Sequence, residues 1–400
     1  MKQEEKRDRM FEFYMPSQLC IGKGALEKLK QLPMEAAKAC IITTNGRSVK
    51  KYGYLAKVEQ LLKESGIESI LFDKVQANPI RKHVMAAAQL VKKEGCDVIV
   101  GLGGGSAIDT AKCVAAMAVN PGDLWDYIGD GSGKGMDPSN SSLPVIAIPT
   151  TAGTGSEADP WAVTTNEETD EKIDFGNRFS FPVLSIVDPE LMVTVPKRLT
   201  VFQGFDALFH ATEGYIAAAA NPISEILSLR AIELISKNLP LAAADGKNLG
   251  ARSNMALAST ISGIVESISD CTSSHAIAHA LSGKHPKLTH GECLMAICLP
   301  YYEHFLEDAG ERYIKMAEVM GEDVKTFDVK ERPRAFLHAL ERLMTQCGMR
   351  HIHMSQYGVN KNRAREYAQF AYDTMSGLFD EDPRRLTFDE TVDIIEQAIV

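Results

Sequence analysis

The chain has 400 residues, of which 45% are hydrophobic and 24% are charged. Because this length exceeds what one hydrophobic core usually holds, we expect an enzyme-sized globular protein of two domains. The net charge of −10 argues against a nucleic-acid or anionic-membrane partner, which would require a basic excess. No window reaches about 18 uninterrupted apolar residues, and no apolar segment follows the charged start M-K-Q-E-E-K-R-D-R-M, so we expect a cytoplasmic protein.

In the first half of the chain, short apolar runs alternate with segments of 3.6-residue periodicity. This alternation predicts a mostly parallel sheet flanked by helices. We expect strands at residues 19–21, 39–43, 69–72, 97–102, 145–148 and 184–187, and helices at 24–32, 55–64, 80–93 and 106–119. Residues 161–165 and 179–181 are expected to add a small hairpin.

After Pro196 the strand-like runs nearly vanish. Helical periodicity continues at residues 206–220, 224–237, 251–267, 274–281 and 292–306. We therefore predict an α/β domain at residues 1–195 and an all-helical domain at residues 196–400.

A glycine-rich turn follows the apolar strand at residues 98–102 and precedes a helix. It consists of Gly103, Gly104, Gly105 and Ser106. Glycines let backbone N–H groups approach an anion, and the helix start adds its positive end, so the turn favours a phosphate or pyrophosphate. A tight strand-to-helix turn without a ligand is the alternative interpretation. The segment P-T-T-A-G-T-G-S-E at 149–157 follows the next apolar strand, so a dinucleotide spanning both loops is the interpretation that we prefer.

Two pairs of polar residues have the spacing of metal ligands on a helix. His275 and His279 are four residues apart, as are Asp206 and His210, so each pair projects from one helix face. Imidazole and carboxylate donors suit Fe²⁺ or Zn²⁺ better than Mg²⁺ or Ca²⁺. The eight cysteines form no C-x-x-C pair, and Cys271 and Cys293, near these histidines, are interpreted as small buried hydrophobic residues.

Four motifs, in this order and at these separations, resemble the iron-dependent (group III) alcohol dehydrogenases, which include lactaldehyde reductase, 1,3-propanediol dehydrogenase and the butanol dehydrogenases. The motifs are G-G-G-S-A-I-D-T-A-K, P-T-T-A-G-T-G-S-E, D-A-L-F-H-A-T-E-G-Y and H-A-I-A-H followed by H-G. The resemblance spans nearly the whole chain. It implies a dehydroquinate synthase-like architecture, with an α/β nucleotide-binding domain, an all-helical domain, an active site in the cleft between them, and a homodimer or larger homo-oligomer.

The resemblance also implies an activity and a set of site residues. The activity is NAD(P)-linked oxidation of small primary alcohols or reduction of their aldehydes, in which the metal polarises the substrate oxygen during hydride transfer at nicotinamide C4. The metal, Fe²⁺ or alternatively Zn²⁺, would be bound by Asp206, His210, His275 and His290. His279 would be a non-ligand that relays a proton. The implied contacts of NAD(H) or NADP(H) are Thr44, Gly103, Gly104, Gly105, Ser106, Asp109, Thr150, Thr151, Thr154, Lys172 and Leu191.

The chain departs from the family pattern at three places. Where NAD-dependent relatives often carry an Asp, it has Thr44-Asn-Gly-Arg-Ser48 followed by Lys50 and Lys51, so NADP(H) is credible, although a solvated helix start explains the lysines equally well. Glu266 and Asp270 replace an apolar residue and a glycine of several relatives, and Glu266 either faces a polar substrate pocket or faces solvent. Trp161 is not a departure, because the resemblance places it at a substrate-pocket position of the family. His290 follows His275 by fifteen positions, one more than the lactaldehyde-reductase branch of the family implies, and we expect an insertion at 284–288 to absorb the extra residue.

Three other functions are compatible with the same residues. One is a zinc-dependent polyol dehydrogenase of the glycerol or dehydroquinate-synthase kind. The second is a phosphoester hydrolase in which the Asp and His residues bind a metal that activates water. The third is a metal-stabilised nucleotide sensor without catalytic activity.

Overall fold

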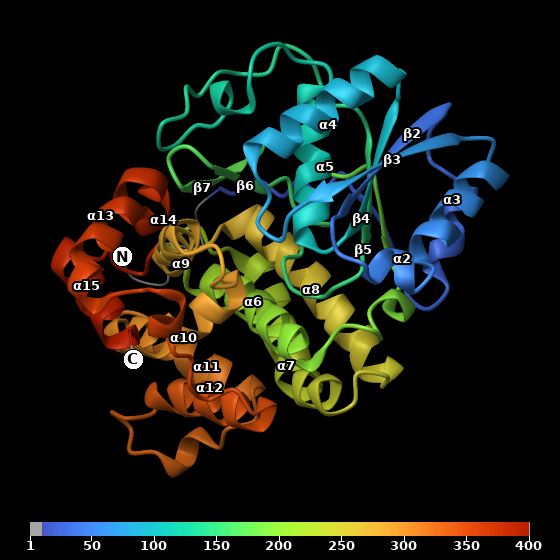
Figure 1. The fold of residues 1–400 in the computed structure, drawn as a ribbon. Coiled ribbons are helices and arrows are strands. Elements are labelled where there is room, and N and C mark those ends of the chain that lie inside the picture. The colour runs from blue at the N-terminus through green and yellow to red at the C-terminus, as the bar shows by residue number, and fades with distance from the viewer. Residues whose placement is uncertain (1–9, 400) are drawn as a thin grey trace. The chain divides into compact units, whose positions relative to one another are not determined.

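The computed structural model describes residues 10–399 (Figure 1). The expectation for the charged start of the chain falls on residues 1–9, outside the described residues. The described chain forms two compact units. Residues 15–195 and 246–260 make up one, here called the α/β unit, and residues 10–14, 196–245 and 261–399 make up the other, here called the helical unit.

The α/β unit is built on a six-stranded, wholly parallel sheet, in the order β1-β8-β5-β4-β2-β3. Its strands are β1 (Gln18–Ile21), β2 (Lys38–Thr44), β3 (Glu68–Val75), β4 (Val98–Gly103), β5 (Val145–Pro149) and β8 (Leu184–Val187). Every residue of β4 and β5 is buried, as expected for central strands of a sheet covered on both faces. The prediction of a mostly parallel sheet is confirmed.

Helices cover both faces of this sheet (Figure 1). On one face, α4 (Arg81–Glu94) and α5 (Gly105–Met117) share a buried apolar cluster with β2 and β4. On the other face, η1 (Ala25–Lys30) and α3 (Tyr54–Glu64) form a second cluster with the same strands. The short helices of this unit are α2 (Ser48–Lys51), η2 (Leu124–Asp126) and η3 (Pro189–Leu191). Central strands with apolar side chains on both faces therefore separate two cores.

The predicted hairpin was wrong in its second strand. β6 (Ala162–Asn166) pairs antiparallel with β7 (Glu171–Phe175), whereas residues 179–181 lie in a turn in which the Ser180 N–H donates to the Asn177 carbonyl. The physical reason is that β7 reads E-K-I-D-F, which looks like an exposed loop although Glu171 and Lys172 are buried. Asp170, at φ 61°, turns the chain back before the apolar residues 179–181 are reached.

The helical unit contains no strand among its described residues, which agrees with the prediction of an all-helical second part. α6 begins at Lys197 rather than at residue 206, because Pro196 occupies the cap position and apolar residues continue through Val201, Phe202 and Phe205. The helices are α6 (Lys197–Ile216), α7 (Pro222–Ala244), α8 (Leu249–Ser269), α9 (Ser273–Lys284), α10 (His290–His304), α11 (Gly310–Val319), η4 (Val324–Thr326), α12 (Arg334–Cys347), η5 (Met354–Tyr357), η6 (Lys361–Arg363), α13 (Ala364–Met375), α14 (Gly377–Asp380) and α15 (Phe388–Ala398). The first part of α8, up to residue 260, is grouped with the α/β unit.

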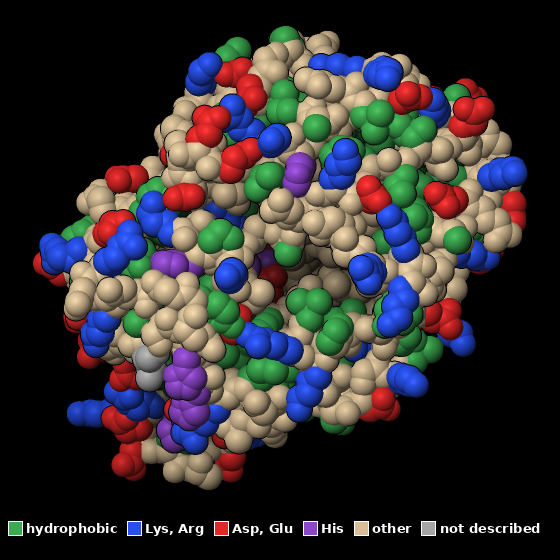
Figure 2. Space-filling view, viewed as in Figure 1, with side chains coloured by type: hydrophobic (Ala, Val, Ile, Leu, Met, Phe, Trp, Pro, Cys, Tyr) green, Lys and Arg blue, Asp and Glu red, His purple; other side chains and the backbone are tan. Residues whose placement is uncertain are grey.

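Acidic and basic side chains are interspersed on the face drawn in Figure 2. Within residues 10–399, no helix has the length and apolar character needed to span a membrane.

Candidate metal centre and cofactor loops

The helical unit positions Asp206 and His210 on one buried face of α6. Their four-residue spacing places both side chains on the same stripe, and they are 4% and 5% exposed. Glu213 continues this stripe and is fully buried. A helix that buries three ionisable residues in an otherwise apolar stripe indicates a functional site, because buried charges require a partner or a metal ion.

The histidines of α9 and α10 meet this stripe. The ring of His275 stacks on that of His210, with centroids 4.7 Å apart, and lies 5.2 Å from the ring of His290. His290 is the first residue of α10, and its Nε2 lies 3.5 Å from Asp206 Oδ1. The loop at residues 285–289 connects α9 to α10, and the insertion predicted at 284–288 stays a prediction.

These residues fit a divalent metal ion. Donor atoms of Asp206, His275 and His290 lie within 4.8 Å of one another, and His210 joins His275 in a second such group. A carboxylate and neutral imidazoles form a borderline donor set that suits Fe²⁺ or Zn²⁺. Three separate helices supply the donors, so the helical fold itself assembles the metal-binding site.

Glu213 sets the orientation of His275. Its Oε2 lies 2.9 Å from His275 Nδ1 and also accepts hydrogen bonds from the backbone N–H and the hydroxyl of Thr272. A carboxylate that accepts from Nδ1–H fixes the tautomer in which Nε2 carries the lone pair. His275 is thereby prepared to bind a metal through Nε2.

In the α/β unit, the two loops predicted to bind a dinucleotide lie side by side. β4 pairs with β5 in parallel, with Gly103 opposite Pro149, and the Thr150 N–H donates to the Gly103 carbonyl. β2 pairs with β4 in the same direction, so Thr44 ends at the same edge of the sheet. Parallel sheets bind ligands at this carboxyl edge.

The glycines at this edge are required by the closeness of the two loops. A Cβ added at Gly104 would lie 2.9 Å from Thr151 Oγ1, and one at Gly105 would lie 2.5 Å from Thr154 Cγ2. α5 begins at Gly105, so the backbone N–H groups of its first turn lie at this edge of the sheet. A helix start with closely packed hydroxyl side chains favours a pyrophosphate.

Comparisons with known proteins identify the family. Residues 16–189 match the family model for iron-containing alcohol dehydrogenase, and residues 200–399 match that for the C-terminal part of the Fe-containing alcohol dehydrogenase family. This chain belongs to the iron-containing alcohol dehydrogenase family.

Individual relatives agree with this membership. A choline dehydrogenase of Bacillus subtilis is 35% identical over 83% of this chain and 82% of its own length. An NAD-dependent methanol dehydrogenase of Bacillus methanolicus is 33% identical over 98% of this chain and 100% of its own. The solved structure of an archaeal halo-thermophilic alcohol dehydrogenase from a Red Sea brine pool superposes with a TM-score of 0.91, at 32% identity, over 98% of this chain and 99% of the other.

Membership in the iron-containing alcohol dehydrogenase family makes this chain an NAD(P)-linked oxidoreductase that acts on alcohols, with iron and NAD(H) as its cofactors. The predicted resemblance, fold class, enzyme class and cofactors are confirmed. The role of each individual residue stays a prediction.

The remaining predicted cofactor residues of this alcohol dehydrogenase differ in where they lie. Thr44 is half-buried at the end of β2, whereas Leu191 is buried in the apolar cluster beneath α3. Asp109 is buried on α5, where it accepts hydrogen bonds from the Ser156 hydroxyl and the Val163 N–H, and burial raises the pKa of its carboxyl. Lys172 is buried on β7. Ser106 donates through its hydroxyl to the Ala77 carbonyl.

The candidate proton relay, His279, lies beside the metal-ligand cluster. Its ring centroid is 4.8 Å from that of His290, in an edge-to-face arrangement, and 6.3 Å from that of His275. His285, which matches no family position, instead lies with Nε2 3.0 Å from the hydroxyl of Tyr367. A structural role therefore fits His285.

The two candidate substrate residues lie in different units. Trp161 immediately precedes β6 in the α/β unit, where buried Lys112 donates to its carbonyl and forms an ion pair with Asp159. Glu266 lies on α8 in the helical unit, with Oε2 3.8 Å from His210 Nε2. Its side chain is 16% exposed, so the interpretation that Glu266 simply faces solvent is wrong.

Glu213 was missed by the sequence analysis, although a signal for it was present in the sequence. Glu213 stands three residues after His210, on the same helix face, in a segment that is otherwise apolar. A carboxylate at that spacing from a ligand histidine is a natural partner for another ligand's second nitrogen.

We expect Glu213→Gln to lower the affinity for metal about 10- to 100-fold, because the amide no longer fixes the His275 tautomer with a charged acceptor. The measurement is competition between the protein and a chelator for Zn²⁺ or Fe²⁺. Glu225→Gln is the matched control, since Glu225 forms an ion pair with Arg312 on another pair of helices. Equal metal affinity in Glu213→Gln and wild type would show that Glu213 does not orient His275.

Proposed function

We propose that this chain interconverts small primary alcohols and their aldehydes, and that Asp206, His210, His275 and His290 are its metal ligands. The observation that carries the proposal is the convergence of donors from α6, α9 and α10 on one another within the helical unit. We further propose that residues 1–195 form the dinucleotide-binding domain and residues 196–400 the metal and substrate domain. We also propose that the protein is cytoplasmic and that it forms a homodimer or a larger homo-oligomer.

The residues have distinct roles in this reaction. When bound, the divalent ion supplies Lewis-acid polarisation of the alcohol or carbonyl oxygen. Asp206 contributes the one anionic donor, and burial of His210 and His275 keeps competing water away from their nitrogens. His279 passes the hydroxyl proton toward solvent. Trp161 is proposed to shape the substrate pocket.

For the cofactor, the glycine turn of residues 103–106 and the loop with Thr150, Thr151 and Thr154 are proposed to hold the pyrophosphate. The proposed contacts of the riboses and the nicotinamide are Thr44, Asp109, Lys172 and Leu191. Lys50 forms an ion pair with Asp73, and Lys51 lies over the ring of Tyr52 at 5.2 Å. These contacts favour NAD(H) over NADP(H), since both lysines already have structural partners.

The test is an aldehyde reduction assay on anaerobically iron-loaded protein, with NADH and NADPH compared over a short aldehyde series. The proposal expects oxidation of the reduced cofactor that depends on both the aldehyde and iron. Zinc dependence with activity on secondary polyols would favour a glycerol-type dehydrogenase instead. Turnover of a phosphoester without binding of either cofactor would favour a hydrolase, and cofactor binding without any turnover would favour a nucleotide sensor.

Glu266 suggests that the preferred alcohol carries a polar or cationic group. Its carboxylate lies beside a proposed metal ligand, and one relative of this chain is a choline dehydrogenase. We expect Glu266→Gln to lower kcat/KM for choline by about tenfold more than for 1-butanol, because a partly buried charge contact contributes on the order of 1.4 kcal/mol. Steady-state oxidation of both alcohols measures the ratio. An equal loss of kcat/KM for both alcohols would indicate that Glu266 acts through His210 rather than through contact with the substrate.

A further inference from the structure

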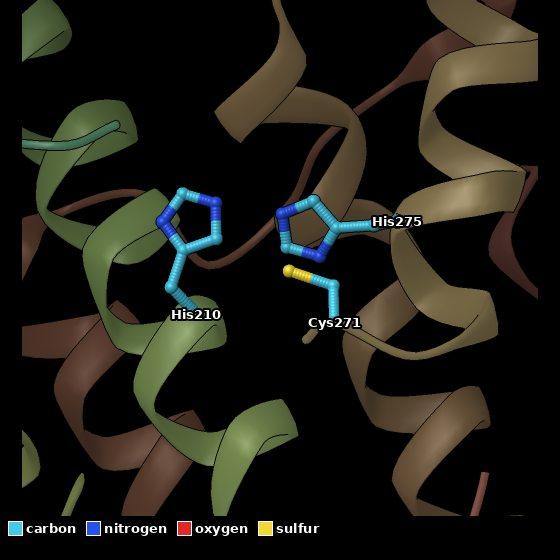
Figure 3. A group of neighbouring side chains, drawn as sticks. All are labelled: His210, Cys271 and His275. Carbon is cyan, nitrogen blue, oxygen red and sulfur yellow. The ribbon is translucent and has the colours of Figure 1, made fainter. Parts of the chain in front are cut away.

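The first turn of α9 carries His275 and is held by a chain of buried hydrogen bonds. His275 is the third residue of the helix, and its ring faces that of His210 on α6 (Figure 3). Its Nδ1 lies 2.9 Å from Glu213, which accepts hydrogen bonds from both the N–H and the hydroxyl of Thr272. Thr272 immediately precedes the helix, so the position of His275 depends on how firmly Thr272 is held.

A tyrosine of α10 contacts Thr272 on its other side. The hydroxyl of Tyr301 lies 2.7 Å from Thr272 Oγ1 and 2.8 Å from Asp382 Oδ1, so its one proton can be donated to either oxygen. Tyr301 and Thr272 are fully buried, and Asp382 is 3% exposed. Because all three side chains are closed to solvent, the loss of one of them would leave buried polar groups without a partner.

Asp382 also caps the start of α9. Its Oδ1 accepts hydrogen bonds from the N–H of Ser273 at 3.1 Å and from the Ser273 hydroxyl at 2.9 Å. Ser273 is the first residue of α9, and Thr272 at the cap position makes no side-chain hydrogen bond to the helix. An oxygen acceptor at a helix start satisfies one of the N–H groups that the helix leaves open. Asp382 therefore supplies this cap from a distant part of the chain.

The segment that carries Asp382 is itself tied to the end of α6. Asp382 lies between α14 and α15. Its neighbour Glu381 accepts hydrogen bonds of 2.8 Å from the N–H groups of Ala218 and Ala219, through its carbonyl and its carboxylate respectively. One end of the hydrogen-bonded chain is thus attached just beyond α6, and the other end reaches Glu213 on the same helix.

We propose that Asp382 and Tyr301 are positioning residues of the metal centre, which hold the start of α9 so that His275 meets the other ligands. This inference rests on the metal centre proposed above and adds no ligand to it. The hydroxyl of Tyr301 acts through Thr272 and Glu213, and the carboxyl group of Asp382 acts through the first turn of α9. Partners that orient a ligand histidine contribute to metal affinity, so the loss of either contact should weaken metal binding.

Tyr301→Phe removes the hydroxyl and leaves the ring in place. We expect its dissociation constant for Zn²⁺ to rise about fivefold, since one net hydrogen bond has about that effect. The measurement is competition with a chelator on metal-free full-length protein. Tyr302→Phe is the matched control, because Tyr302 is equally buried but places its hydroxyl 2.6 Å from Thr212 Oγ1. Thermal melts should show a similar loss of stability in both variants, whereas only Tyr301→Phe should bind Zn²⁺ more weakly.

Substitution of Asp382 tests the cap of α9. Asp382→Ala removes the acceptor of Ser273 and should raise the dissociation constant for Zn²⁺ by about tenfold. Asp382→Asn retains an oxygen acceptor and should stay within about threefold of wild type. Co²⁺ bound in place of Zn²⁺ reports the ligand geometry directly: its visible d–d bands should change in Asp382→Ala and match wild type in Asp382→Asn.

The outcomes separate this inference from the proposed metal centre. Equal Zn²⁺ affinity in the two tyrosine variants, whether both match wild type or both bind more weakly, would overturn the positioning role and leave the metal centre intact. Unchanged d–d bands and Zn²⁺ affinity in Asp382→Ala would overturn it as well. Failure of wild type to bind Zn²⁺ or Co²⁺ would overturn the metal centre and, with it, this inference.

Discussion

His275→Ala is expected to leave the protein without tightly bound metal and to lower the rate of aldehyde reduction by at least about a thousandfold. His275 is the residue common to both groups of potential ligands, and its ring lies next to those of His210 and His290. Loss of Lewis-acid polarisation of the carbonyl removes several kcal/mol of transition-state stabilisation, and about 4 kcal/mol corresponds to that factor. Metal content by elemental analysis and steady-state kinetics measure the two effects.

The same variant should bind NADH as wild type does. The glycine turn and the Thr150 loop belong to the α/β unit, whereas His275 belongs to the helical unit. His285→Ala is the control, because His285 follows the end of the same helix and contacts Tyr367 instead of the cluster. Normal metal content in His275→Ala would contradict the ligand set, and a parallel loss of NADH binding would indicate general misfolding.

Much of this architecture could be predicted because the apolar periodicity of each segment reports its burial. β4 and β5 are buried at every position and read as continuous apolar runs, so both were recognisable as strands of a buried parallel sheet. The spacing of Asp206 and His210, and of His275 and His279, was equally informative, since helix geometry fixes which residues share a face. Patterns of this kind depend only on residues that are close in sequence, so they can be recognised without knowledge of the tertiary contacts.

Features that depend on contacts between distant segments were not predictable in this way. β7 was missed because Glu171 and Lys172 are buried there. Glu171 accepts hydrogen bonds from Trp125 and Ser132, which are distant in sequence, so a local pattern cannot predict them. Cys271 looked like one buried thiol among eight until the turn at Asp270 and the approach of α6 placed it beside His210. Sequence spacing shows which residues share an element, whereas packing decides which elements meet.

Gly291→Ala is expected to weaken metal binding and to lower kcat/KM about a hundredfold, although residue 291 is not a ligand. A Cβ at this position would lie 2.1 Å from the Phe202 carbonyl oxygen and 2.7 Å from the Phe202 carbonyl carbon. Both are backbone atoms of α6, so the first turn of α10 must move away by about 1 Å to restore van der Waals contact. His290 is the first residue of α10 and would move with it, away from Asp206. A displacement of about 1 Å at a reacting centre costs about a hundredfold in rate.

This close approach gives a physical reason for the glycine in the H-G pair, because no other residue lets α10 begin against α6. Overpacking should also destabilise the fold by about 1–3 kcal/mol, which a thermal melt detects. Gly377→Ala is the matched control: Gly377 also begins a helix, but a Cβ there would meet no atom within 4 Å. If Gly291→Ala held metal as tightly as the control variant, the first turn of α10 would be able to shift without carrying His290 out of the centre, and the position of that imidazole would have to be set by other contacts.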